Sequence, residues 1–101
     1  MDFSQLAVTI DTWHTAGTVV IRPHIENPFP VTLQYRMTVM QTSAQGTSSI
    51  NQQGDVQTGV QANSVTLSLA ADASCQVRLQ VLEGDVLLKQ VEAPCSRTTP
   101  L

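Results

Sequence analysis

Charged residues are scarce in this chain of 101 residues, where Asp, Glu, Lys and Arg together make up 13%. That is about half of the roughly 25% that is typical of soluble domains. The five Lys and Arg residues form no run and the formal net charge is -3, so the chain lacks the basic stretch that nucleic-acid binding requires. No apolar run approaches the length of about 18 residues that a membrane-spanning helix needs. We therefore expect neither a nucleic-acid partner nor a membrane span.

Motifs of catalysis and metal binding are missing as well. The sequence contains no Gly-x-Ser-x-Gly, no phosphate-binding loop and no pair of carboxylates at facing core positions. His14 and His24 are its two histidines, and we expect them on opposite faces of a hairpin, where they would be solvated rather than joint ligands. We therefore expect no enzymatic activity, no cofactor and no metal.

Apolar and polar residues alternate over much of the chain, most clearly in its last third. Strict alternation is the period of a half-buried strand. The Gly84-Asp85 pair then interrupts the pattern, as a turn would. A helix is the alternative, because Val77, Val81 and Leu88 sit at roughly helical offsets, but the Gly-Asp pair would break it. We predict a hairpin of two antiparallel strands.

Two cysteines define the register of this hairpin. Residues that face each other in an antiparallel pair have a constant sum of residue numbers, and Cys75 opposite Cys95 requires a sum of 170. The same register sets Arg78 opposite Glu92, a favourable pair. It also demands a three-residue or bulged turn, because a tight two-residue turn would give a sum of 169. We predict a structural Cys75–Cys95 disulfide and an oxidising compartment; two separate buried thiols, or a redox centre, are the alternatives.

The beginning of the chain predicts a second hairpin. Alternation marks one strand at about residues 5–13 and another at residues 18–26. Matching their apolar faces gives a sum of 33, which sets Asp11 opposite Arg22 and supports the register. Pro23 cannot donate a hydrogen bond to a ladder, so we expect an edge or a bulge at that position.

The remaining chain predicts further short strands. In chain order they are a strand at 31–39, a loop at 43–47, and strands at 48–52, 56–60 and 65–69. The strand at 31–39 carries large inward side chains and is expected to lie centrally. The whole pattern predicts an all-β, immunoglobulin-like sandwich of about seven antiparallel strands. We expect one domain over residues 1–101, with residues 96–101 as a flexible tail.

Several of these segments resemble a known family. They are Thr18–Ile25, Val31–Val39, and Val65–Asp72 running into Gln76–Val81 and Gly84. Together they resemble the CsgC/CsgH family of curli accessory proteins, and its alphaproteobacterial branch in particular. The resemblance implies a periplasmic immunoglobulin-like sandwich that keeps a disordered, Gln/Asn-rich curli subunit from forming amyloid. A Cys-x-Cys motif on the third strand of some members is replaced here by Leu33-Gln34-Tyr35, so a redox role based on that motif is absent.

Two surfaces are candidates for binding such a client. Arg22, Arg36 and Arg78 project outward from strands among neutral residues, and with Gln34 and Gln80 they could form a basic outer face that attracts acidic stretches. The alternative is that two of these arginines merely pair with carboxylates on neighbouring strands. We name these five residues as the client-binding site.

The second candidate surface is an open strand edge at residues 48–60. This segment carries one charge, Asp55, and no proline, so it lacks the usual protection against strand addition. The alternative is that a covering loop or its shortness protects it. Trp13 lies on the outer parity at a strand end, where it could be exposed or partly packed.

The function that this resemblance implies is that of a non-catalytic, monomeric periplasmic chaperone that inhibits amyloid formation by the curli major subunit. A subunit or assembly factor of a surface fibre or pilus is the alternative, and a thiol oxidoreductase is a third class. Residues Met1–Gln5 resemble no secretion signal. Since the predicted disulfide and the resemblance imply export, we expect this sequence to be that of the mature form.

Overall fold

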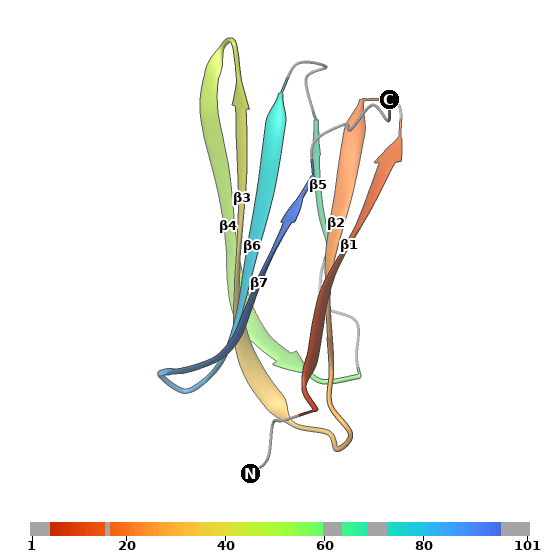
Figure 1. Cartoon of the computed structure of the whole chain (residues 1–101), viewed down its shortest axis with the longest axis vertical. Coiled ribbons are helices and arrows are strands. Elements are labelled where there is room, and N and C mark those ends of the chain that lie inside the picture. The colour runs from red at the N-terminus through yellow and green to blue at the C-terminus, as the bar shows by residue number, and fades with distance from the viewer. Residues whose placement is uncertain (1–4, 16, 60–63, 69–72, 96–101) are drawn as a thin grey trace.

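Seven antiparallel strands form two facing sheets in the computed structural model, which describes residues 5–15, 17–59, 64–68 and 73–95 (Figure 1). The strands are β1 (Ala7–Thr15), β2 (Thr18–Glu26), β3 (Thr32–Ser43), β4 (Gly46–Gln57), β5 (Val65–Ser68), β6 (Ser74–Glu83) and β7 (Val86–Pro94). The strand order is β1-β2-β5 in one sheet and β4-β3-β6-β7 in the other. The predicted all-β sandwich is confirmed. The predicted tail at 96–101 lies outside the described residues.

The β1–β2 hairpin has the predicted register, with Val8 opposite Ile25 and Asp11 opposite Arg22. Its first strand begins and ends two residues later than expected. Strand β5 pairs with β2 only from Thr18 to Ile21, so beyond that point β2 has a described neighbour on one side alone. Pro23 lies in this stretch, opposite Ile10 of β1 and without a described neighbour on the other side, which agrees with the edge position expected for a residue that lacks an N–H.

The β6–β7 hairpin also has the predicted register over most of its length, with Arg78 opposite Glu92. Near the turn the pairing is offset by one residue, and a bulge between Val81 and Leu82 restores the predicted sum. The turn itself is the two-residue Gly84-Asp85, and Gly84 has a positive φ of 60°, a conformation that glycine adopts without a steric penalty. The predicted bulged hairpin is therefore confirmed.

The predicted disulfide is present at the far end of this hairpin. Cys75 and Cys95 are bonded, with their Cα atoms 4.8 Å apart, and both residues are buried. The backbone N–H of Cys95 donates to the carbonyl of Cys75 at 2.9 Å. The described residues contain no free cysteine, which excludes the alternative of two separate thiols.

Strand β4 differs from the prediction. We expected a loop at 43–47 and two short strands, but a single strand of 12 residues runs from Gly46 to Gln57. It pairs with β3 without interruption from Ser43 opposite Gly46 to Thr32 opposite Gln57. Most of its side chains are exposed, so the strand has no apolar alternation to detect. Backbone pairing with the central strand β3 maintains it despite its weak local signal.

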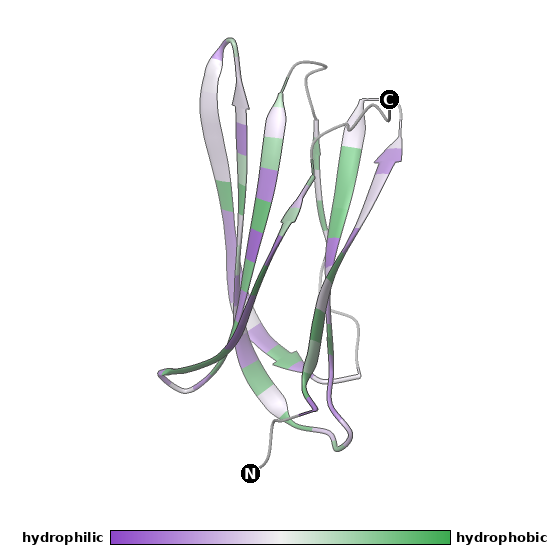
Figure 2. Cartoon of the chain, viewed as in Figure 1, coloured by the Kyte–Doolittle hydropathy of each residue, from purple (hydrophilic) through white to green (hydrophobic). Residues whose placement is uncertain are grey.

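The core lies between the sheets and is built by alternate residues of the inner strands. Its buried members include Val19, Ile21, Leu33, Met37, Val39, Val77, Leu79 and Val81. The alternation along β6 is visible in the hydropathy colouring of its ribbon (Figure 2). Because one parity of β3 and β6 enters the core, the other parity of both strands covers the outside of the four-stranded sheet.

One side of the sandwich is closed by polar contacts between β1 and β7, which lie next to each other. His14 Nε2 lies 2.9 Å from the carbonyl of Cys95. At the other end of the same side, Lys89 Nζ donates to the carbonyl of Leu6 at 3.1 Å. His14 is therefore exposed at a strand end, as expected, and it also links the end of β1 to the end of the β6–β7 hairpin.

Candidate interaction surface

The outer face of the four-stranded sheet carries side chains in regular rows, read from the pairing of β4, β3, β6 and β7. One row is Gln53, Arg36, Gln80 and Gln90, and the next is Asn51, Thr38, Arg78 and Glu92. A third row, nearer the β6–β7 turn, contains Asp55, Gln34 and Leu82. Side-chain amides are the commonest groups in these rows. We call this surface the amide face.

Hydrogen bonds between neighbouring strands hold part of the amide face in place. Gln80 Nε2 donates to Gln90 Oε1 at 2.8 Å, and Thr38 Oγ1 donates to Asn51 Oδ1 at 3.0 Å. Bonds of this kind between exposed side chains contribute up to about 1 kcal/mol each. The face is consequently polar and partly ordered without being strongly charged.

The charges in these rows balance, with Arg36 and Arg78 matched by Asp55 and Glu92. Arg78 Nε lies 3.3 Å from Glu92 Oε1, and both side chains are about half exposed; such a pair contributes about 0 to 1 kcal/mol. Among the described residues, no ion pair involves Arg36 or Asp55. The guanidinium of Arg36 thus lies on this face without an ion-pair partner among the described residues.

Four of the five residues that we named from the sequence are brought together on this face. Arg36, Arg78, Gln34 and Gln80 lie on adjacent strands β3 and β6, with Arg36 opposite Gln80 and Arg78 two positions further along. Arg22 does not join them, because β2 belongs to the other sheet.

Arg22 is instead part of a separate contact on the outside of the three-stranded sheet. Its guanidinium carbon lies 5.1 Å from the ring centroid of Trp13, a cation–π contact that contributes about 0.5 to 1 kcal/mol at an exposed site. Trp13 remains 47% exposed. No ion pair joins Arg22 to the facing Asp11, although the structure describes both side chains.

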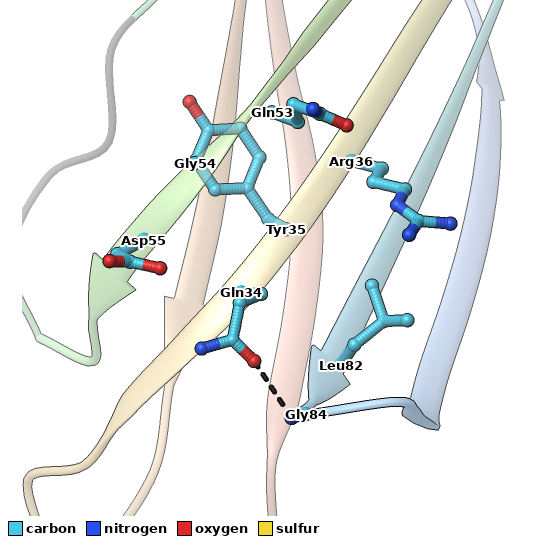
Figure 3. Close-up of a pocket in the computed structure, with 8 residues that line it drawn as sticks. All are labelled: Gln34, Tyr35, Arg36, Gln53, Gly54, Asp55, Leu82 and Gly84. Atoms are coloured by element: carbon cyan, nitrogen blue, oxygen red, sulfur yellow. Dashed lines mark hydrogen bonds between the residues drawn. The ribbon is translucent and has the colours of Figure 1, made fainter.

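A shallow pocket of about 320 Å³ lies on the amide face beside the β6–β7 turn (Figure 3). Its lining comprises Gln34, Tyr35, Arg36, Gln53, Gly54, Asp55, Leu82 and Gly84. Gln34 Oε1 accepts a hydrogen bond from the backbone N–H of Gly84 at 2.8 Å. Burial raises the pKa of the Tyr35 phenol above its ordinary value of 10.0. Local sequence patterns do not predict this pocket, because its residues come from β3, β4 and β6 and from the β6–β7 turn.

Strand β4 forms one edge of the four-stranded sheet and has only β3 as a neighbour among the described strands. It contains no lysine or proline, and its single charge is Asp55. The opposite edge, β7, is bridged to β1 by the two contacts described above. The predicted lightly protected edge therefore exists as a longer strand than expected; Val60, which we had included, lies outside the described residues.

The described residues contain no group of three or more His, Cys, Asp or Glu side chains that could hold a metal ion. The other histidine, His24, lies beside a single carboxylate: its Nε2 atom is 3.0 Å from Glu26 Oε1, and both side chains are exposed. No described helix has the length and hydropathy to cross a membrane.

Comparison with known proteins gives no match to any family model and none to any curated protein. Among solved structures, CsgH of R. palustris superposes with a TM-score of 0.71 at 22% identity, over 88% of this chain and 91% of that one. The curli protein CsgC of E. coli superposes with a TM-score of 0.70 at 13% identity, over 86% and 96% of the two chains. This chain has the CsgC/CsgH fold. The resemblance predicted from the sequence is thereby confirmed at the level of the fold.

Proposed function

We propose that this protein is a non-catalytic periplasmic chaperone that keeps an unfolded curli-type amyloid subunit from assembling into fibres. The observation that carries the proposal is the fold shared with the curli protein CsgC and with CsgH over nearly the whole chain. The buried disulfide supports an oxidising compartment. We propose that the protein acts as a monomer and needs no cofactor.

The amide face is the surface that we assign to the client. Its neutral amides can exchange hydrogen bonds with an unfolded chain, and the guanidinium of Arg36 can attract a carboxylate. Gln34, Gln80 and Arg78 lie beside it on the same face. Hydrogen bonds between exposed polar groups are weak, and the attraction of a carboxylate to Arg36 is weakened further because salt screens exposed charges. Weak contacts suit a chaperone that must delay assembly and then release its client for export.

The edge of β4 provides a second mode of contact at the border of the same face. An unpaired strand edge offers a row of backbone donors and acceptors to any extended chain. A client strand that pairs with β4 would be unable to pair with another copy of itself along the same edge. The same open edge would also serve a fibre subunit that polymerises by strand addition, which is the second candidate function.

Fibre kinetics test the proposal. A curli major subunit is allowed to assemble with thioflavin T, alone and with this protein at ratios below one to one. We expect a longer lag phase at substoichiometric ratios, and an unrelated immunoglobulin-like domain of similar size serves as the control. An unchanged curve at an equimolar ratio contradicts the proposal. Concentration-dependent light scattering by this protein alone would instead support the fibre subunit.

A further inference from the structure

The two sheets have four edge strands, β1, β5, β4 and β7, and these edges differ in how well they are covered. Strands β1 and β7 lie next to each other and are joined by the contacts of His14 and Lys89. Strand β5 has only four residues, and a strand this short is a poor template for pairing. Strand β4 has 12 residues, so among the described strands it offers the longest open row of backbone N–H and C=O groups.

Strand β4 carries none of the features that usually prevent one sheet edge from pairing with another. Proteins block such pairing with lysine or proline on the edge strand, with a bulge, or with a charged side chain that points inward. Strand β4 has no lysine or proline, and it pairs with β3 without a register shift from Gly46 to Gln57. Its one charge, Asp55, has the outward parity and lies near one end. The edge is therefore regular enough to pair with another extended strand.

Ile50 marks the part of β4 that the rest of the described chain leaves uncovered. It faces Val39 of β3 and therefore lies on the same, inner side of the sheet. Val39 is 1% exposed, whereas Ile50 is 38% exposed, and Ser48 on the same side of β4 is exposed as well. The core thus ends at β3 in this region. A further strand beside β4 would cover the apolar side chain of Ile50.

A second copy of β4 matches this edge when the two strands run antiparallel. An even sum of facing residue numbers keeps inward side chains beside inward ones. A sum of 100 sets Ile50 opposite Ile50 of the second copy and pairs residues 46–54 with the same segment in reverse; all of these residues are uncharged, and Asp55 lies outside the paired segment. Sums of 102 and 104 would instead set Ile50 opposite Gln52 or Gly54, which leaves the apolar side chains unmatched.

We propose that two copies of this chain associate reversibly through β4, antiparallel and about a two-fold axis at Ile50. The two four-stranded sheets then form one continuous sheet, and the assembly closes at two copies because each chain uses its β4 edge once. One strand edge per copy is a small interface beside the roughly 1,200 Å² of a stable complex, so the pair exchanges with the monomer. The inference concerns this chain alone and does not rest on the proposed function. The pair covers the edge offered to a client, and dissociation exposes it again.

Sedimentation equilibrium over protein concentrations from about 10 µM to about 1 mM tests the pair, since contacts of this size are weak. We expect the average mass to rise from that of one chain toward that of two and no further. Ile50→Lys sets two ammonium groups opposite each other and should raise the dissociation constant at least about tenfold. Met40→Lys makes the same change of charge at an exposed position of β3 and should change it less than about twofold. A single-chain mass throughout, equal effects of the two variants, or growth beyond two copies overturns the proposal.

Cross-linking through introduced cysteines tests the register. Facing Cα atoms lie about 4.5 to 5.5 Å apart, within the range that a disulfide needs, so Ile50→Cys should form a covalent dimer under a mild oxidant. Thr47→Cys is the matched control: Thr47 faces Gln53 of the second copy, so its two thiols would lie six residues, or about 20 Å, apart. We expect Ile50→Cys to cross-link at least about tenfold faster, and equal rates overturn the pairing. A wild-type protein that delays fibres but stays monomeric overturns the pair alone, whereas one that pairs and leaves fibre kinetics unchanged contradicts the proposed function.

Discussion

Reduction of the Cys75–Cys95 disulfide should lower the stability of the sandwich by an amount that its sequence separation sets. The bond joins residues 20 positions apart, and closing a loop of that length in the unfolded chain is worth about 3 kcal/mol at 25 °C in the chain-entropy model. Reduction leaves two buried thiols and no cavity, so the change in stability comes mainly from the entropy that the unfolded chain regains when the loop is opened. An unfolding entropy of about 2.1 cal/mol/K per residue converts this loss into a fall of about 15 °C in Tm.

The assay is thermal unfolding followed by circular dichroism, with and without a phosphine reductant. The double variant Cys75→Ala/Cys95→Ala is the control, because its Tm should not respond to the reductant. The hydrogen bond from His14 to the Cys95 carbonyl should persist only while the end of β7 stays in place, so the His14 ring resonances report the same event. A fall in Tm of less than about 3 °C would refute the reasoning, since the bond would then add little to what the hairpin already provides.

Three further changes test other parts of the account. Arg36→Glu should weaken client binding by about 1 kcal/mol, roughly fivefold, and should shorten the lag phase of fibre formation relative to the wild-type protein. Arg22→Glu on the other sheet should change neither quantity. Equal effects of the two variants would exclude the amide face as the client-binding surface. The raised pKa of Tyr35 means that the folded state binds the phenol proton more tightly than the unfolded state does. The contribution of this group to stability is therefore complete below pH 10 and is lost as the pH rises through the folded-state pKa. In urea unfolding, Tyr35→Phe should reduce the fall of the unfolding free energy at alkaline pH, and an unchanged dependence on pH would contradict this. Leu79→Ala, in the fully buried centre of β6, should cost about 2 to 5 kcal/mol in the same assay, whereas Met40→Ala at a 49% exposed position should cost less than about 0.5 kcal/mol.

Both hairpins could be predicted because each carries two independent signals. In the last hairpin, the cysteine pair and the facing Arg78 and Glu92 agree on one register, and the structure has that register. In the first, apolar matching and the facing Asp11 and Arg22 agree in the same way. Cross-strand pairs of this kind restrict a register more strongly than propensity does, because a slip of one residue moves every side chain to the other face.

Strand β4 and the grouping of the arginines could not be predicted from local patterns. The 12 residues of β4 are held by the facing strand β3, and their Ser, Thr, Gln and Gly content gives no period of two. The alternation of inward and outward residues correctly predicts that Arg22 and Arg36 lie on outer faces. It does not predict that these faces belong to different sheets, because sheet membership depends on the pairing of distant strands. The pocket was missed for the same reason.

The most direct test of the account is to map the client on the folded protein. Isotope-labelled protein is mixed with an unlabelled, monomeric curli major subunit before fibres form, and the backbone amide resonances are recorded at low and high salt. We predict shifts confined to the outer positions of β3 and β6 and to the edge strand β4, smaller at high salt. Shifts centred on Trp13 and the outside of the three-stranded sheet, or none at a concentration that delays fibres, would contradict the claim that the amide face and its open edge hold the client.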